Sequence, residues 1–219
     1  MAAVKQGAGV PQAAGTRAAR DALWQMGGFF SLTLSSYLMV MLLARGLGPA
    51  ADGIYGVSYA TLLAIELTTR LGIPQATAKL AAGSADRARS IEATGITLAA
   101  LVSLLAVAAM WVAAPLLARL LNVPDGARLF RIAASDLPFF ALYGVLVHVL
   151  NSRRQFRASG IVAMVYGLGK VVGTVVMLMS GLTSIGAALV VNALASLAGV
   201  LALLPQVGLV ALKPALAER

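Results

Sequence analysis

Long apolar segments alternate with short polar ones along most of this chain. The first apolar run, Ala22 to Ala44, has 23 residues without a charge, and similar runs recur toward the C-terminus. A helix rises about 1.5 Å per residue, so about 20 apolar residues cross the roughly 30 Å hydrocarbon core of a bilayer. The pattern predicts six membrane-spanning helices, at about 22–45, 53–78, 93–118, 132–152, 158–180 and 185–205.

The boundary between the last two spans needs an argument of its own, because residues 171–212 contain no charged residue. As one helix this stretch would extend about 63 Å, which is twice the thickness of the core. The segment SGLTSIG (180–186) has the turn residues at which the chain can fold back. We therefore predict an all-α polytopic membrane protein. A short, poorly ordered cytoplasmic arm (1–21) precedes a six-helix lobe (22–205), and a cytoplasmic tail (206–219) follows it.

Two polar interruptions are predicted to lie at the outer surface of the membrane. In LLARGLGPAADGIYG (42–56), Gly48 and Pro49 end the first span and Asp52 opens the second. A loop inside the hydrocarbon would leave backbone groups unsatisfied, so this hairpin must lie at the interface. The segment RLLNVPDGARLFR (119–131) is predicted to form a short helix lying along the same interface.

Composition supports the membrane assignment. Hydrophobic residues make up 60% of the chain, charged residues only 11%, and the mean hydropathy is +0.89, whereas average proteins are about 25% charged. The net charge of +9 would suggest nucleic acid in a soluble protein. Here no basic run is interleaved with aromatics, so we expect no nucleic-acid partner. The bilayer itself, with its anionic lipids, is the expected partner of the positive charge.

The distribution of the cations predicts orientation. Eleven Lys and Arg residues lie in segments on the side of the N-terminus, four lie on the other side, and Arg70 and Lys170 lie within spans. Because cytoplasmic loops are enriched in Lys and Arg, both termini are predicted to be cytoplasmic, in a multi-pass protein of the inner (cytoplasmic) membrane.

Catalytic and metal chemistry is hard to build from this sequence. The chain has no Cys and a single His, which excludes disulfides and thiolate sites and leaves little material for a transition-metal site. No nucleotide-binding glycine motif and no nucleophile–His–acid arrangement is present. We expect neither an enzyme nor a cofactor.

Two charged residues in the second predicted span, Glu66 and Arg70, are spaced i, i+4 in the favourable order for an ion pair. A charge at the bilayer centre costs about 2.5–3.5 kcal/mol on insertion scales. In one interpretation Arg70 only neutralises Glu66. In the other, these residues and Tyr59 line a polar cavity. Both interpretations stay open.

Lys170 is predicted to lie about 18 Å into the fifth span, too deep for its side chain to reach water easily. It shares a helical face with Tyr166 and with Gly169 and Gly173, a small-residue packing motif. The lysine therefore points toward protein. It either pairs with a carboxylate such as Glu66 or faces a water-filled cavity, and we favour the cavity.

Other polar residues within the spans are more readily structural. Asn192, in the middle of the sixth span, is predicted to form an interhelical hydrogen bond, with a cavity role as the alternative. Asp136 lies at the outer start of the fourth span, where we expect it to be solvated. The small residues Gly27, Ser31 and Ser35 form a stripe on the first span that is typical of helix packing.

Three segments of the chain resemble one transporter family. They are LLARGLGPAADGIYG (42–56), LTTRLGIPQATAKLAA (67–82) and FRIAASDLPFFALYGVLVHVLNSRRQFRASGIVAMVYGLGKVVGTVVM (130–177). The sequence is similar to polysaccharide and oligosaccharide flippases (Wzx-like) of the multidrug/oligosaccharidyl-lipid/polysaccharide (MOP) superfamily, and the first hairpin is the most specific part.

The resemblance implies a function. Such proteins move undecaprenyl-pyrophosphate-linked glycans, including O-antigen units of lipopolysaccharide, across the membrane by alternating access between two six-helix lobes. By position, Arg70 and Lys170 would bind the anionic headgroup, since a pyrophosphate in mid-membrane needs cations. Glu66 and Asn192 complete the candidate substrate-binding set.

The resemblance covers one lobe, so a partner is expected. Two copies of the chain, a separate C-terminal lobe, or a truncated reading frame would each explain a six-span chain. Two other functions remain open. A cation-coupled drug exporter of the same superfamily would use Glu66 as its ion-linked carboxylate. A membrane scaffold or degenerate fragment would use the buried charges only as structural pairs.

Overall fold

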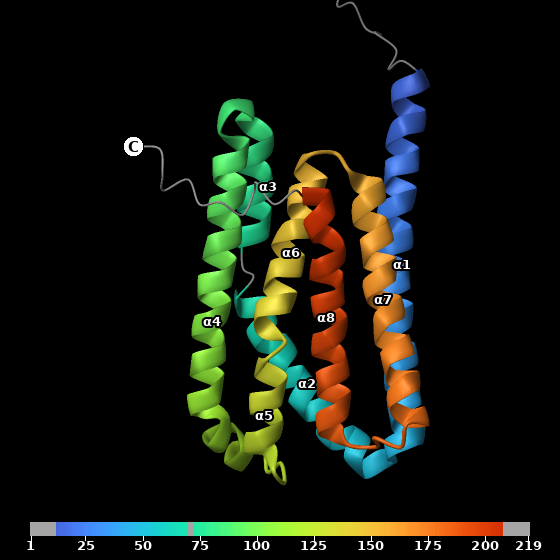
Figure 1. Ribbon diagram of the computed structural model, residues 1–219, viewed down its shortest axis with the longest axis vertical. Coiled ribbons are helices and arrows are strands. Elements are labelled where there is room, and N and C mark those ends of the chain that lie inside the picture. Colours follow the sequence, from blue (N-terminus) through green and yellow to red (C-terminus); the bar gives the residue numbers. More distant parts are fainter. Residues whose placement is uncertain (1–11, 70–71, 208–219) are drawn as a thin grey trace, which may run out of the picture.

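The computed structural model describes residues 12–69 and 72–207, and within them every regular element is a helix (Figure 1). The predicted all-α class is therefore confirmed. The elements, in chain order, are α1 (Gln12–Leu47), α2 (Pro49–Thr69), α3 (Ile73–Gly83), the 3₁₀ turn η1 (Ala85–Arg87), α4 (Ala88–Leu120), α5 (Gly126–Ala134), α6 (Leu137–Ser152), α7 (Phe156–Met179) and α8 (Ile185–Val207).

Helix α1 is longer than the predicted first span. It begins at Gln12, so the second half of the predicted N-terminal arm is helical rather than poorly ordered. Its apolar part, from Ala19 to Leu47, is one of five helical segments in the described residues that are long and apolar enough to cross a membrane. The other four are Ala88–Leu120, Gly126–Ser152, Phe156–Met179 and Ile185–Val207.

The second predicted span is not one helix. Helix α2 ends at Thr69, and α3 starts again at Ile73 after Gly72, whose φ of +81° is a left-handed conformation that favours glycine. Pro74, in the first turn of α3, lacks the amide hydrogen that a continuous helix would need there. Arg70 falls in the gap and lies outside the described residues.

The first predicted hairpin has the expected geometry. Only Gly48 separates α1 from α2, and its φ is +81°. The amide of Asp52 donates to the Gly48 carbonyl at 3.0 Å, which closes the first turn of α2. A single residue with positive φ thus reverses the chain, because glycine has no Cβ to clash in this conformation.

The segment predicted to lie along the interface instead enters the bundle. After a turn in which Asn122 and Asp125 both have positive φ, α5 runs inward and continues almost directly into α6. Phe130 and Ala134 are fully buried in this short helix. The interfacial prediction was wrong because Val123, Leu129 and Phe130 are buried against other helices, which the local sequence does not reveal.

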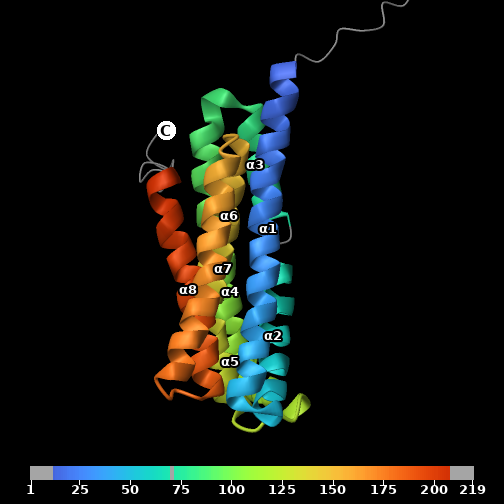
Figure 2. The same ribbon diagram turned by 90° about the vertical axis from the view of Figure 1, so that its right-hand side faces the viewer.

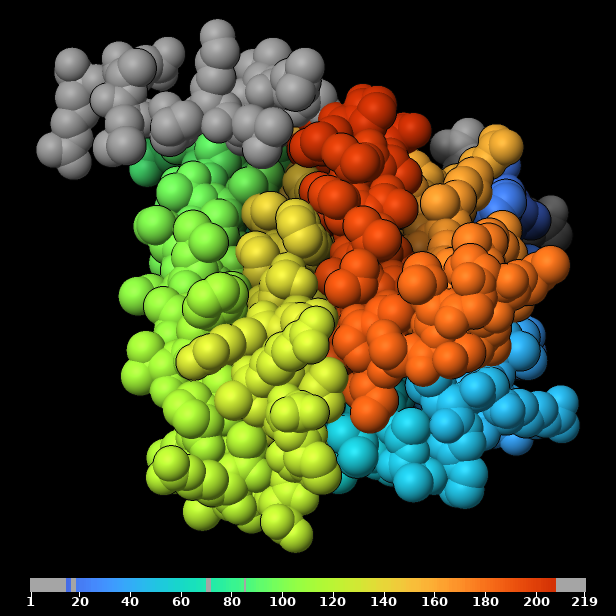
Figure 3. Space-filling view, turned by 60° about the horizontal axis from the view of Figure 1, so that its bottom comes forward, coloured from blue at the N-terminus to red at the C-terminus, as the bar shows by residue number. Residues whose placement is uncertain are grey.

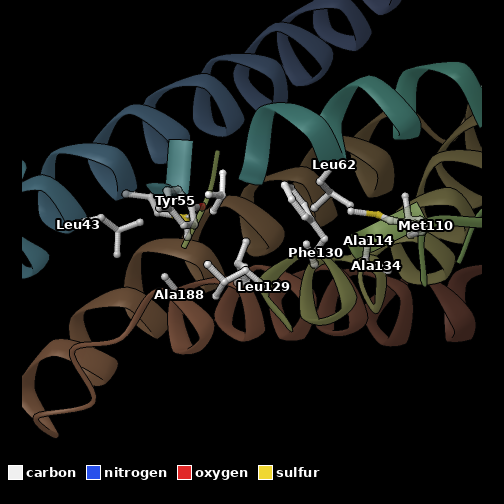
Figure 4. Packing of buried hydrophobic residues seen from close by; sticks show 14 of the residues in the cluster. Leu43, Tyr55, Leu62, Met110, Ala114, Leu129, Phe130, Ala134 and Ala188 are labelled. Atoms are coloured by element: carbon white, nitrogen blue, oxygen red, sulfur yellow. Dashed lines mark hydrogen bonds between the residues drawn. The ribbon is translucent and has the colours of Figure 1, made fainter. Parts of the chain in front are cut away.

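The hydrophobic core cluster around Phe130 contains residues from helices between α1 and α8 (Figure 4). Phe130 of α5 packs with Leu62 of α2 and Met110 of α4, while Leu43 and Ala188 bring in α1 and α8. A second core cluster, around Leu146 of α6 and Leu203 of α8, lies toward the other end of the bundle.

Helices α1 and α7 run side by side at one edge of the bundle (Figures 1 and 2). Their small residues allow close contact, since a Cβ added to Gly160 would lie 2.5 Å from the Trp24 carbonyl oxygen, and one added to Gly167 would lie 2.7 Å from Ser35 Oγ. The predicted packing role of the small-residue stripe on the first span is confirmed.

Both described chain ends lie at one end of the bundle, together with the α3–α4 and α6–α7 connections (Figure 1). The α1–α2, α4–α5 and α7–α8 turns lie at the opposite end, which Figure 3 turns toward the viewer. Gly181, with φ +74°, makes the predicted turn between α7 and α8. The outer surface exposes large apolar side chains such as Val112 (81%) and Met179 (84%), as expected for a surface that faces lipid.

Candidate functional site

Lys170 lies on α7 with only 4% of its surface exposed. Its ammonium donates to the Tyr59 hydroxyl at 3.4 Å and lies 4.9 Å from the centre of the Tyr166 ring and 5.6 Å from that of Tyr59. Cations within about 6 Å of a tyrosine ring face are attracted by the ring quadrupole. Two aromatic rings therefore hold this cation inside the protein.

The positions of the two tyrosines follow from helix geometry. Tyr166 precedes Lys170 by four residues and so shares its face of α7. Tyr166 also packs on Tyr143 of α6, with ring centres 4.8 Å apart. On α2, Tyr59 stacks on Tyr55 at 5.7 Å, so each ring that contacts the lysine is supported by another aromatic ring.

Two buried carboxylates surround this cation at longer range. Asp136, between α5 and α6, is 1% exposed, and Glu66 of α2 is 3% exposed. The charges of both interact with the Lys170 ammonium. Among the described residues, however, the ion pair within 4.0 Å joins Arg153 and Glu92, and none involves Lys170. The two carboxylates therefore offset the charge of Lys170, but neither forms a close ion pair with it.

Asp136 is held by α8. The Asn192 side-chain amide donates a short hydrogen bond to Asp136 Oδ2. The predicted interhelical hydrogen bond of Asn192 is therefore confirmed, whereas the predicted solvation of Asp136 was wrong. Asp136 is buried because α5 turns into the bundle and carries the start of α6 inside with it.

Each partner of this hydrogen bond keeps one side-chain oxygen that takes no part in it. Within the described part of the chain, Asp136 Oδ1 and Asn192 Oδ1 are buried and have no hydrogen-bond partner. One turn farther along α8, the Ser196 hydroxyl lies 3.3 Å from that of Tyr166. We call Tyr59, Asp136, Tyr166, Lys170, Asn192 and Ser196 the lysine cluster.

The structure thus brings together most of the predicted site. Lys170 and Asn192 belong to the lysine cluster, and Glu66 lies close enough for its charge to act on Lys170. Arg70 lies outside the described residues. The Lys170 side chain is buried beside the rings of Tyr59 and Tyr166, and the predicted water-filled cavity stays a prediction.

The glycine motif beside Lys170 serves helix packing. A Cβ added to Gly173 would lie 2.8 Å from Val191 Cγ1, and one added to Gly169 would lie 3.9 Å from the Ala195 Cβ. Both neighbours belong to α8, so α7 packs closely on α8 at the level of Lys170, as the motif predicted.

A second polar group, near the opposite end of α6, is absent from the sequence-based predictions. Arg153 donates to both carboxylate oxygens of Glu92, at 3.0 and 2.5 Å, and to the Val207 carbonyl at 2.9 Å. This contact joins α4, the end of α6 and the end of α8. Glu92 is separated from Arg153 by 61 residues, and no local pattern pairs them.

Comparison with known proteins agrees with this architecture. The model of the Polysaccharide biosynthesis protein family matches residues 18–209. The chain belongs to this family. The matched range covers nearly every described residue, including the whole lysine cluster. No curated protein matches the chain.

A solved structure shares the fold of this family member. It is described as the outward-facing conformation of a multidrug resistance MATE family transporter of the MOP superfamily. The two superimpose with a TM-score of 0.71 at 16% sequence identity, over 85% of this chain and 43% of the transporter. The chain therefore spans less than half the length of that protein, and over that part the two share a fold.

Proposed function

We propose that this chain is one lobe of a transporter that moves undecaprenyl-pyrophosphate-linked oligosaccharide or polysaccharide units across the cytoplasmic membrane by alternating access. Three findings support the proposal: the family match over residues 18–209, the MOP-type fold, and a cation buried in the middle of a span. The buried cation, Lys170, is the observation on which the proposal depends.

A buried lysine in a membrane protein is costly, since a cation at the bilayer centre costs about 2.5–3.5 kcal/mol on insertion scales. A purely structural lysine is expected to be locked in a close ion pair. Lys170 instead makes a long hydrogen bond and two ring contacts. Such a cation can exchange its weak contacts for a phosphate, which is a stronger acceptor.

Movement of α2 would open the lysine cluster. Tyr59 belongs to α2, whereas Lys170 and Tyr166 belong to α7. Because Gly72, with its positive φ, lies between the two helices, we propose that α2 can shift while α3 stays in place. When Tyr59 withdraws, the ammonium becomes accessible to an anionic headgroup, and Asp136 and Glu66 balance its charge again after release.

A second lobe is part of this proposal. The chain covers 43% of the transporter that it resembles, and a single lobe would line only one side of a central pathway. We propose that a second copy or a separate six-helix chain provides the other side. Both termini of this lobe are placed in the cytoplasm, as the distribution of Lys and Arg predicts.

Replacement of Lys170 tests the proposal. We expect Lys170→Gln to reduce glycan export at least tenfold, because the variant removes the charge while keeping a polar side chain, and Lys170→Arg to retain part of the activity. Export is measured as surface glycan in cells that depend on this chain, with the amount of membrane-inserted protein determined in parallel.

Lys79→Gln is the matched control, since Lys79 is an exposed lysine on α3. It should leave export unchanged. Normal export by inserted Lys170→Gln protein would show that the buried cation does not bind the headgroup, and the proposed mechanism would fail.

One observation favours a second candidate, a cation-coupled drug exporter. Asp136 and Asn192 each present a buried oxygen without a hydrogen-bond partner among the described residues. A buried carboxylate can take up a proton, and carboxylate and amide oxygens together can coordinate a small cation. In that case drug export would depend on Asp136 or Glu66 and would survive Lys170→Gln. Drug resistance conferred by the Lys170→Gln and Asp136→Asn variants distinguishes the two functions.

A further inference from the structure

A groove of about 500 Å³ opens on the surface between α3 and α4. These two helices are in contact and lie on the side of the bundle away from α7 and α1 in Figure 1. Most of the lining is apolar, and its members recur at intervals of three or four residues, so each helix contributes one face. The lining includes Ile73, Ala76, Leu80, Ile91, Thr94 and Leu98.

The groove extends over most of the depth of one leaflet. Its lining on α4 runs from Ser90 to Leu98, a rise of about 12 Å, compared with about 15 Å for half of the hydrocarbon core. Leu80 and Leu98 expose 58% and 46% of their surfaces beside it. Large apolar side chains exposed along a groove of this length match a lipid tail better than water.

The end of the groove nearest the α3–α4 connection is polar and basic. Arg87 directly precedes α4 and Ser84 directly follows α3, so both lie at the α3–α4 connection, beyond the end of the apolar lining. Ser90 itself lines the groove. Arg87 is exposed, so its guanidinium is accessible to a phosphate.

The charge around this connection is positive. Lys79, Arg87 and Arg89 are exposed here against one exposed carboxylate, Asp86. An interfacial cation attracts anionic lipid by about 1 kcal/mol. The surroundings therefore favour a headgroup with a net negative charge over a zwitterionic one.

We propose that the α3–α4 groove binds one anionic glycerophospholipid from the leaflet at this end of the bundle, the cytoplasmic one by the distribution of Lys and Arg. One acyl chain lies along the apolar lining toward Leu98, and the phosphate lies between Arg87 and the Ser84 and Ser90 hydroxyls. This site is separate from the lysine cluster and does not depend on the proposed transport function.

The test is native mass spectrometry of the full chain in detergent, titrated with phosphatidylglycerol or with phosphatidylcholine of the same acyl chains. We expect Arg87→Gln to weaken the tightest phosphatidylglycerol binding about fivefold, as for loss of one interfacial cation, and to leave phosphatidylcholine binding unchanged. Arg89→Gln is the matched control, because Arg89 lies on the opposite face of α4 from the groove and its loss should weaken phosphatidylglycerol binding less than Arg87→Gln does.

A second pair of variants tests the apolar part. Ala76→Phe fills the groove and should weaken binding of both lipids, whereas Ala82→Phe, exposed on the opposite face of α3, should not. Thermal unfolding in detergent shows that each variant is folded. Arg87 is exposed, so its variant remains informative even if Ala76→Phe unfolds the protein.

Three results would overturn the proposal. The first is equal weakening by Arg87→Gln and Arg89→Gln. The second is phosphatidylglycerol binding that a folded Ala76→Phe variant leaves intact. The third is displacement of phosphatidylglycerol by undecaprenyl phosphate at equal concentration, which would assign the groove to the polyprenyl tail of a transport substrate.

Discussion

Individual polar residues inside this bundle are held by partners from distant parts of the chain. Asp136 and Asn192 are 56 positions apart, and each is at most 1% exposed. Burying a polar group costs free energy unless the group is hydrogen-bonded. The two residues therefore act as a unit that connects the α5–α6 junction to α8.

Replacing one member of this pair should lower the free energy of unfolding more than replacing both. We expect Asn192→Leu to lower the free energy of unfolding by about 1–3 kcal/mol, because Asp136 is left buried without its donor. The double variant Asp136→Leu with Asn192→Leu should recover part of this loss. Thermal or denaturant unfolding in detergent provides the measurement, with the exposed Thr94→Ala as control.

An unchanged stability of Asn192→Leu would mean that Asp136 finds another donor or is hydrated in the membrane. Equal losses for the single and double variants would show that the leucine at 192 is itself too large for the site, and that the hydrogen bond does not determine the cost.

At the scale of helices, close contact depends on glycine and alanine, the residues with the smallest side chains. Helices α1 and α7 approach each other at Gly160, Ala163 and Gly167 of α7. In a membrane there is no hydrophobic force between helices, so their association depends on close packing of this kind. The length of this interface explains how α1, at the edge of the bundle, is held.

Gly160→Ala should therefore loosen α7 from α1. The added Cβ would meet the Trp24 carbonyl oxygen at 2.5 Å, and a backbone atom cannot move aside as a side chain can. We expect a loss of about 1–3 kcal/mol, typical of overpacking. Gly169→Ala, on the same helix with its nearest atom at 3.9 Å, should be close to neutral. Equal unfolding temperatures for both variants would contradict this interpretation of the contact.

At the scale of the whole molecule, the two ends differ in charge. Toward the end with the α3–α4 and α6–α7 connections lie six cations, Lys79, Arg87, Arg89, Arg153, Arg154 and Arg157, whereas four, Arg45, Arg119, Arg128 and Arg131, lie toward the other end. The positive end should face the cytoplasm.

Single cysteines can test this orientation directly, because the natural chain contains no Cys. In intact cells, a membrane-impermeant maleimide should label Asp125→Cys, in the α4–α5 turn, and should not label Arg154→Cys, in the α6–α7 connection. Permeabilised cells should label both and so confirm that each site is reactive. Labelling of Arg154→Cys from outside would reverse the orientation.

The sequence alone was sufficient for much of the architecture. Charge-free runs of about 20 residues predict membrane helices because backbone polar groups in lipid must be satisfied within a helix. The turns at Gly48 and at 180–184 followed from glycine and local turn chemistry, and the burial of Lys170 and Asn192 followed from their depth within apolar runs. These features depend on local sequence, which is why they could be predicted.

Only the tertiary structure decided which distant residues meet. The entry of α5 into the core, the burial of Asp136 and the contact between Glu92 and Arg153 all result from packing between helices far apart in the chain. Local sequence sets how deep a residue can lie, because the bilayer imposes one length scale on every helix. It does not set the partner that a residue finds there, because that depends on how the helices rotate and pack against one another.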